Sequence, residues 1–243
     1  MIEIFPTPET LADAVARHIV VRADGAIATA GRFTLALAGG STPRDAYARL
    51  ATDDFARWVE WERVHVLWGD ERCVPPDDPR SNYRMAKEAL LDRVPIPAQQ
   101  IHRIRGEDPP EKAAAEYERE LRALLDGEGL DLALLGLGED GHTASLFPGQ
   151  PAVHATERWV VAVPAPPGNL WRVTLTPAVL GLAKHVTFVV SGASKSLRLA
   201  QVLQGPFTPD LLPAQAIRPR QGVLTWMVDQ AAGSQLRPAP VST

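Results

Sequence analysis

The segment Asp140-Gly141-His142 carries the residues best suited to acid–base chemistry. A histidine side chain titrates near neutral pH, and a neighbouring carboxylate raises its affinity for a proton. The segment follows residues 130–137, which have the apolar composition of a buried strand. We therefore predict that His142 is a general base that moves a proton to or from water, with Asp140 beside it. The alternative is a surface histidine in a glycine-rich turn, and we expect that role for the other five histidines, at positions 18, 65, 102, 154 and 185.

A glycine-rich segment, residues 39–45, has the composition of an anion cradle. It follows the apolar residues 33–38, and its glycines would let backbone N–H groups approach a phosphate. We predict that Thr42 is a helix N-cap, that Pro43 is the first helical residue, and that Asp45 completes a capping-box-like pair. An ordinary strand-to-helix turn is the alternative. The segment is not a Walker loop, because no Gly-Lys-Ser/Thr follows.

The charged run Asp70-Glu71-Arg72 also follows an apolar segment, residues 64–68. Three adjacent charges usually lie on a solvated surface. The position directly after a predicted strand favours a place in a binding site instead. The carboxylates, together with the acid–base pair, could also bind a hard divalent cation, but the sequence has no closely spaced ligand set of that kind. We therefore expect no metal.

Three cations are candidate ligands of a small anion: Arg72, Arg172 and Lys195. An arginine offers a planar fork of donors to a phosphate, and a lysine offers a point charge. Taken alone, each of them is more typical of an ordinary surface cation. Their common positions near the ends of predicted strands favour a shared anion site.

Residues 136–141 match the G-x-G-x-x-G pattern of dinucleotide-binding proteins. That pattern requires a helix that starts at the glycines, and Pro148 and Gly149 interrupt any such helix. Asp140 and His142 also stand where a pyrophosphate needs bare backbone. We therefore expect no nicotinamide cofactor.

These residues belong to a regular alternation of predicted strands and helices. The predicted strands are residues 33–38, 64–68, 130–137, 158–163, 186–190 and 223–228. The predicted helices are residues 8–22, with a continuation to 29 left open, and 43–51, 82–93, 109–126, 177–182 and 194–204. Strands that are apolar on both faces and alternate with helices indicate an α/β fold with a mostly parallel sheet and helices on both faces.

The predicted sheet would bring the polar loops together. In open parallel sheets, ligands bind beyond the carboxyl ends of the strands. Four polar loops follow predicted strands and would share that edge: residues 39–45, 69–72, 138–142 and 191–195.

The composition of the 243-residue chain is that of a soluble globular protein, with 45% hydrophobic and 22% charged residues. These fractions exclude intrinsic disorder, collagen-like repeats and coiled coil. We expect a single domain over residues 1–243. The net charge is −4 and no basic stripe is present, so we expect no nucleic acid partner.

Cellular location is constrained by one cysteine and by the absence of long apolar runs. Cys73 allows no internal disulfide, which favours a reducing compartment. Residues 1–30 lack the pattern of a signal peptide, and no run approaches the length of a membrane span. We expect a cytoplasmic protein with no membrane association, as a monomer or weak dimer.

Six segments together resemble the 6-phosphogluconolactonase family, which lies within a superfamily that includes glucosamine-6-phosphate deaminase. They are LAGGSTP at 37–43, WGDER at 68–72, SNY at 81–83, LGLGEDGHTASLFP at 135–148, RVTLT at 172–176 and SGASK at 191–195. The resemblance covers nearly the whole chain. The related deaminases have tyrosine in place of Arg72, and they continue differently after the Gly-His pair. Arg72 and residues 143–148 therefore favour the lactonase.

The resemblance implies a Rossmann-like α/β fold, no cofactor, and a phosphosugar lactone as the small-molecule partner. The implied reaction is hydrolysis of 6-phospho-D-glucono-1,5-lactone to 6-phospho-D-gluconate in the oxidative pentose phosphate pathway. It also implies a histidine base at His142, oriented by Asp140. The substrate-binding residues that it implies are Gly40 and Asp70 on the pocket wall, Arg72 with Arg172 on the phosphate or other substrate oxygens, and Lys195, Ser41 and Thr42 at the anion site.

One part of the chain departs from the family pattern. Many relatives have basic residues before the strand that carries Arg172, whereas residues 164–171 read PAPPGNLW and contain no lysine. We expect phosphate binding to depend more on Arg172 and Lys195 as a result. Two other functions stay open: an aminosugar-phosphate deaminase/isomerase, and a sugar-phosphate-binding regulator without catalysis.

Overall fold

The computed structural model describes residues 1–166 and 170–237. Its strands are β1 (Ile2–Phe5), β2 (Phe33–Leu37), β3 (Val64–Trp68), β4 (Asp70–Arg72), β5 (Leu132–Leu135), β6 (Val160–Ala165), β7 (Leu170–Leu175), β8 (His185–Val190) and β9 (Val223–Asp229). Its α-helices are α1 (Pro8–Ala30), α2 (Ser41–Leu50), α3 (Asp53–Ala56), α4 (Asn82–Ala89), α5 (Pro110–Leu125), α6 (Pro177–Leu180) and α7 (Ser196–Gln204).

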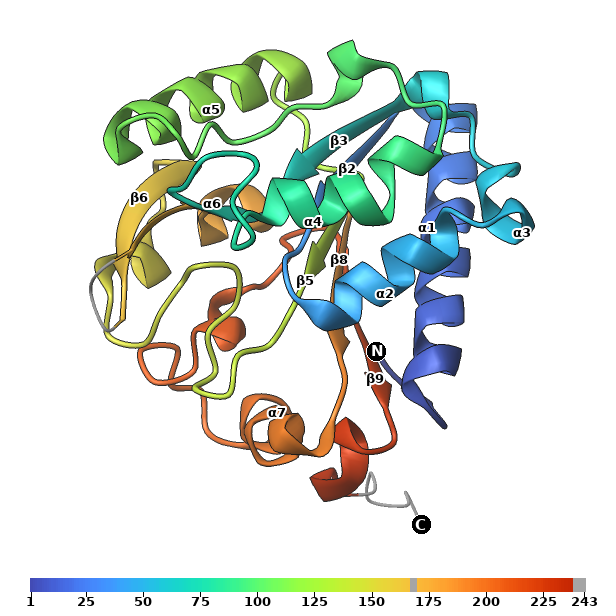
Figure 1. Cartoon of the computed structure of the whole chain (residues 1–243). Coiled ribbons are helices and arrows are strands. Elements are labelled where there is room, and N and C mark those ends of the chain that lie inside the picture. The colour runs from blue at the N-terminus through green and yellow to red at the C-terminus, as the bar shows by residue number, and fades with distance from the viewer. Residues whose placement is uncertain (167–169, 238–243) are drawn as a thin grey trace.

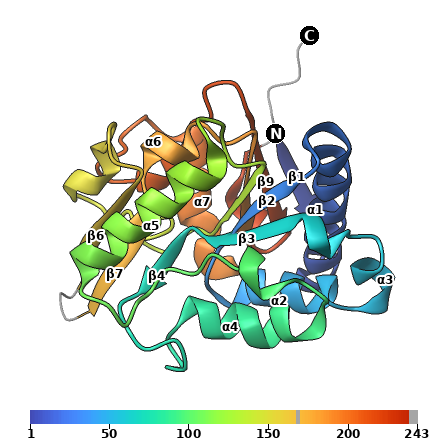
Figure 2. The ribbon, with the colours of Figure 1, turned by 90° about the horizontal axis from the view of Figure 1, so that it is seen from above.

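The main sheet has six strands in the order β1-β9-β8-β5-β2-β3, and every neighbouring pair is parallel. The residues of β2 and β5 are all buried, which explains their continuous apolar sequences. Helices α1 and α2 pack together on one side of this sheet, and α5 lies on the other side against β6 and β7 (Figure 2). The predicted α/β fold with a mostly parallel sheet is confirmed.

A second sheet was not predicted. It has three antiparallel strands in the order β4-β7-β6, and β4 follows β3 after a single glycine. Residues 158–163 were predicted correctly to contain a strand, but β6 belongs to this second sheet. Residues 70–72 were predicted as a loop and form β4, because a charged strand lacks the apolar run that identified the others. Strand β6 extends to Ala165 and so includes the first two residues of the lysine-free segment 164–171.

Two buried tyrosines fix the strand ends next to the polar loops. The Tyr47 hydroxyl accepts a hydrogen bond from the Ala38 N–H (2.8 Å) and donates one to the Ala38 carbonyl (3.0 Å), just after β2. Tyr117 on α5 makes the same pair of bonds with the N–H and carbonyl of Trp68, at the end of β3. Buried backbone groups are therefore satisfied where each strand stops.

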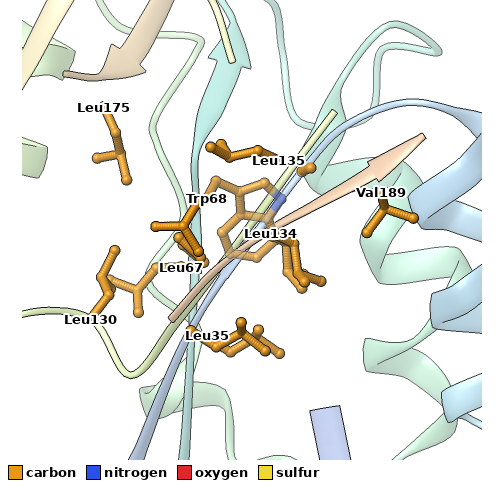
Figure 3. Packing of buried hydrophobic residues seen from close by; sticks show 14 of the residues in the cluster. Leu35, Leu67, Trp68, Leu130, Leu134, Leu135, Leu175 and Val189 are labelled. Carbon is orange, nitrogen blue, oxygen red and sulfur yellow. The ribbon is translucent and has the colours of Figure 1, made fainter. Parts of the chain in front are cut away.

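The core lies between the sheet and its helices. Trp68, Leu134 and Leu135 pack there near the end of β3 (Figure 3), and all three are almost fully buried. Helix α1 begins as predicted, with the Thr7 hydroxyl accepting from the Thr10 N–H (3.3 Å). Within residues 1–166 and 170–237, no helix has the length and apolar character needed to cross a membrane.

Candidate active site

The four predicted polar loops meet at one cavity of about 430 Å³ at the carboxyl edge of the main sheet. Strands β8, β5, β2 and β3 are consecutive neighbours in that sheet, so the loops after them lie side by side. Strand β7 of the second sheet pairs with β4 and contributes Arg172 to the cavity wall. The predicted site residues that line this cavity are Gly40, Asp70, Arg72, Asp140, His142, Arg172 and Lys195.

The remaining two predicted residues, Ser41 and Thr42, line a smaller cavity of about 140 Å³ beside the first. Gly40 and Lys195 line both cavities and connect them. The structure therefore places all nine predicted residues in one region, in two adjoining compartments.

His142 and Asp140 form a hydrogen-bonded pair on the cavity wall. The distance from His142 Nδ1 to Asp140 Oδ1 is 2.6 Å, and the same oxygen accepts from the His142 backbone N–H at 3.0 Å. The hydrogen bond from the histidine side chain lowers the pKa of Asp140 to about 2. An ionised carboxylate can only accept, so it holds the neutral ring in the tautomer with the proton on Nδ1. The lone pair of Nε2 is then available to accept a proton.

The loop that carries this pair is held by its own hydrogen bonds. The Gly138 N–H donates to the His142 carbonyl (2.8 Å), and the Thr143 hydroxyl donates to the Gly136 carbonyl (2.8 Å). Position 138 must be glycine, because a Cβ there would lie 2.1 Å from His142 Nδ1. No helix starts after these glycines, in agreement with the prediction that residues 136–141 are not a dinucleotide-binding motif.

Arg72 and Arg172 are direct cross-strand partners on the neighbouring strands β4 and β7 of the second sheet. Like charges directly opposite each other on a sheet destabilise it. Within the described ranges 1–166 and 170–237, the Nε atoms of both side chains are buried and have no hydrogen-bond partner. Burial, and then the nearby charge of Arg72, lower the pKa of Arg172. Two neighbouring guanidinium groups with unused Nε donors have the chemistry to bind an anion.

The neighbouring carboxylates are buried, so the alternative of a solvated charge run does not hold for them, and Asp70 lines the cavity as expected. Asp70 is 7% exposed and accepts hydrogen bonds from Ser145 Oγ (2.6 Å) and Asn82 Nδ2 (3.2 Å). These contacts join β4 to α4 and to the loop of His142.

Glu71 points away from the cavity and anchors α4. Its carboxylate accepts from the backbone N–H groups of Arg72, Asn82 and Tyr83, each at 2.7 Å, and from the Ser81 hydroxyl at 3.0 Å. Burial raises the pKa of Glu71, and these four hydrogen bonds oppose the rise. Glu71 thus satisfies the start of α4 from a neighbouring strand.

The predicted capping of α2 is wrong. The helix starts at Ser41, and its N-cap is Gly40, with φ of 103° and no side-chain hydrogen bond at the cap. The left-handed conformation of Gly40 starts the helix two residues earlier than predicted. Asp45 is then too far along the helix to cap it, and it pairs with Arg44 at the surface (3.0 Å). The first turn of α2 thus faces the smaller cavity without a side-chain cap.

Lys195 completes the set of cations. It ends a turn of 3-10 helix, Ala193–Lys195, between β8 and α7. Its ammonium lies 3.8 Å from Glu139 Oε1, and the side chain is 25% exposed. The long distance leaves the ammonium able to bind an anion in the cavity.

Sequence reasoning gave no role to Asn82, Ser145 or Phe147, which also line the cavity. Phe147 packs against the imidazole of His142, with ring centroids 5.0 Å apart. All three lie within the segments at 81–83 and 135–148. The family resemblance of these segments was the signal that could have identified them. Their contacts come from other elements, so local composition could not predict them.

The other five histidines do not line the cavity in the described part of the chain. His154 is exposed, as predicted, but His18 on α1, His65 on β3 and His185 on β8 are half-buried on regular elements, so the predicted place in a surface turn is wrong for them. His65 contacts His102, His18 contacts Thr187, His185 contacts Arg22, and His154 pairs with Asp210. Among the described residues no group of three or more His, Cys, Asp or Glu side chains is arranged to hold a metal ion. In the lysine-free segment at 164–171, Ala165 and Pro166 line the cavity, and residues 167–169 lie outside the described ranges.

Comparison with known proteins identifies the family. The family model described as glucosamine-6-phosphate isomerases/6-phosphogluconolactonase matches residues 6–226. The chain is 43% identical to a 6-phosphogluconolactonase of a Nostoc species, covering 97% of this chain and 98% of the relative. It is 36% identical to the 6-phosphogluconolactonase of Haemophilus influenzae, and the match covers 94% of this chain and 96% of the relative.

Solved structures agree with this assignment. The 6-phosphogluconolactonase of Trypanosoma brucei superposes with a TM-score of 0.86 at 31% identity, covering 98% of each chain. A monomeric glucosamine-6-phosphate deaminase superposes with a TM-score of 0.83 at 21% identity, covering 96% of this chain and 99% of that chain, which shows a shared fold. The chain belongs to the glucosamine-6-phosphate isomerase/6-phosphogluconolactonase family.

Proposed function

We propose that this protein hydrolyses 6-phospho-D-glucono-1,5-lactone to 6-phospho-D-gluconate, in the oxidative pentose phosphate pathway. Relatives named 6-phosphogluconolactonase, at 34–43% identity over most of the chain, support this activity. The observation that carries the proposal is the placement of a histidine–carboxylate pair and a crowded arginine pair on one cavity. A base and an anion site on the same cavity suit a phosphorylated ester.

His142 acts as the general base in the mechanism that we propose. Its Nε2 removes a proton from water, and the oxygen of that water attacks the C1 carbonyl of the lactone. A tetrahedral intermediate forms with negative charge on the carbonyl oxygen. The protonated histidine then returns the proton to the ring oxygen as the C1–O bond breaks. Asp140 orients the ring and stabilises the imidazolium.

The phosphate lies far from the reacting carbon, so its binding energy can be used to position the lactone. We assign Arg72 and Arg172 to the phosphate or other substrate oxygens. Lys195, with Ser41 and Thr42 at the open start of α2, completes the anion site. Gly40 and Asp70 form part of the wall that the sugar contacts.

The negative oxygen of the intermediate needs hydrogen-bond donors. The backbone N–H groups of the glycine loops and the Arg72 guanidinium are the two candidates, and such a contribution is typically worth about 3 kcal/mol. Water and one base complete the reaction as written, so the proposal includes no metal or cofactor. It also includes a single domain over residues 1–243, a cytoplasmic location, and a monomer or weak dimer.

The test is turnover of two substrates by the wild-type protein. The lactone is generated in situ, and its loss is compared with a protein-free blank, because such lactones also hydrolyse spontaneously. We expect loss faster than the blank, with or without EDTA, and no ammonia from glucosamine 6-phosphate. Ammonia release without lactone loss would instead indicate the deaminase. Thermal stabilisation by sugar phosphates without any turnover would indicate a non-catalytic regulator.

A further inference from the structure

Asp229 is a buried carboxylate next to the site that the mechanism does not use. It ends β9 and is 1% exposed. No ion pair to Asp229 exists among the residues that the structure describes. A buried charge without a cation is costly unless hydrogen bonds compensate for lost water. Such a residue in a strand-end position needs an explanation.

The hydrogen bonds of Asp229 hold the turn that leads to Lys195. Strands β8 and β9 are parallel and pair Val190 with Val228. The next residues along the chain, Ser191 and Asp229, therefore lie side by side. The carboxylate accepts from the Ser191 hydroxyl, and from the Gly192 N–H at 3.0 and 3.1 Å to its two oxygens. It also accepts from the Ala232 N–H at 2.7 Å.

Gly192 transmits this anchoring to Lys195. Its φ is 97°, a left-handed conformation that turns the chain sharply after β8. The Lys195 N–H then donates to the Gly192 carbonyl at 3.1 Å. The backbone of Lys195 is therefore one hydrogen bond away from the residue that Asp229 holds. Its ammonium, by contrast, has no ion pair in the described ranges other than the 3.8 Å contact to Glu139.

We propose that Asp229 is a positioning residue that fixes the Ser191–Gly192 turn, and thereby places the Lys195 ammonium between the two cavities to bind the phosphate of the substrate. The inference rests on the proposed function, in which Lys195 belongs to the anion site. It assigns to the far end of β9 a role in substrate affinity rather than in bond cleavage.

A chemically matched control exists at the opposite end of the sheet. Asp131 is also a buried carboxylate, and it accepts from the Thr34 N–H and hydroxyl, both at 2.8 Å, and from Lys184 at 2.9 Å. It lies just before β5, at the amino ends of the parallel strands and away from the cavity. Asp131→Asn should destabilise the fold without changing the position of Lys195.

The experiment compares Asp229→Asn, Ser191→Ala and Asp131→Asn with the wild type. The readouts are the Kd of inorganic phosphate by calorimetry, and KM and kcat for the lactone. For Asp229→Asn we expect the Kd and KM to rise about fivefold, with kcat changed less than about twofold, because a loosened ammonium loses part of a charge-assisted contact. Ser191→Ala removes one hydrogen-bond donor to Asp229 and should raise the phosphate Kd and the lactone KM about twofold.

The experiment distinguishes failure of the role proposed for Asp229 from failure of the proposed lactonase function. Unchanged Kd and KM in both Asp229→Asn and Ser191→Ala would overturn the inference, and so would equal rises in Asp131→Asn. If Asp229→Asn does not fold, Ser191→Ala decides alone, because it keeps the carboxylate and its bond to Ala232. A wild type without lactonase activity would defeat the proposed function, whereas the phosphate Kd values would still decide the role of Asp229.

Discussion

The pairing of Arg72 with Arg172 costs free energy in the protein without ligand. Two guanidinium groups lie opposite each other on adjacent strands, with buried Nε atoms left without partners in the described part of the chain. The carboxylates of Asp70 and Glu71 offset part of this repulsion, and Arg72 Nη1 donates to the Arg80 carbonyl, but the two Nε donors stay unused. An anion bound between the two groups would neutralise the repulsion and use the free donors.

Substitution of Arg172 should therefore separate stability from activity. Arg172→Met keeps much of the aliphatic stem and removes the charge, so the midpoint of thermal unfolding without ligand should stay constant or rise. The kcat/KM for the lactone should fall about 100-fold, since charge-assisted contacts to the phosphate are lost. Arg158→Met is the control, because Arg158 pairs with Glu118 and should show lower stability and ordinary kinetics. The reverse pattern in the two variants would contradict this account.

The Asp140 carboxylate makes a pH-dependent contribution to folding. Its pKa is about 2 in the folded protein against an ordinary value of 3.8 for an aspartate, so the ionised form is favoured by folding. The stabilisation is present above pH 4, and it is lost as the pH falls from about 4 towards 2. Urea unfolding of wild type and Asp140→Asn at pH 5 and pH 3 should show a stability difference that shrinks at the lower pH. A difference that is equal at both values would refute the contribution.

At the scale of elements, the loop after β5 determines whether the hydrogen-bonded pair of His142 and Asp140, the proposed catalytic pair, can form. A Cβ at position 138 would lie 2.1 Å from His142 Nδ1 and 2.7 Å from Asp140 Oδ1, closer than side-chain atoms can approach. The ring and the carboxylate must then move, and their 2.6 Å hydrogen bond must break or lengthen.

Gly138→Ala should lower kcat about 100-fold, because an unoriented base loses most of its catalytic contribution. The free energy of unfolding should also fall, because the hydrogen bond between His142 and Asp140 contributes to folding. Gly25→Ala on α1 is the control, because a Cβ there meets no atom within 4 Å. Steady-state kinetics together with thermal unfolding distinguish the two variants. Wild-type kcat in Gly138→Ala would show that the pair tolerates a side chain at this position.

Sequence reasoning succeeded for elements whose burial is uniform and failed where it is not. Strands β2 and β5 are buried throughout, and their continuous apolar runs predicted them. Strand β1 was missed because it is short and half exposed, and β4 because its three residues are charged. The start of α2 was wrong because it depends on the φ of Gly40, which residue types alone did not indicate.

At the scale of the whole molecule, the site is a product of strand order. His142, Asp70 and Lys195 are distant in the sequence, and the consecutive parallel strands β8, β5, β2 and β3 bring their loops to one edge. The general rule for parallel sheets was sufficient to predict this meeting. The contact of Ser145 with Asp70, by contrast, required the exact course of an irregular loop, which no periodicity predicts.

The second sheet explains why the cavity can bind a charged substrate. Strands β4 and β7 place both arginines on the wall next to the loops that carry the base. The main sheet thus supplies the base, the glycine loops and Lys195, and the second sheet supplies the arginine pair. Catalysis in this account requires both parts to hold one substrate between them.

The most direct test of the central claim is the rate of lactone loss with wild type and with His142→Ala, both in EDTA. We expect enhancement over the blank for wild type, and a kcat/KM at least about 10³-fold lower for the variant, because the substitution removes the proposed general base. His154→Ala, which removes a surface histidine paired with Asp210, should retain wild-type activity. Lactone hydrolysis by His142→Ala at the wild-type rate would contradict the assignment of His142 as the base.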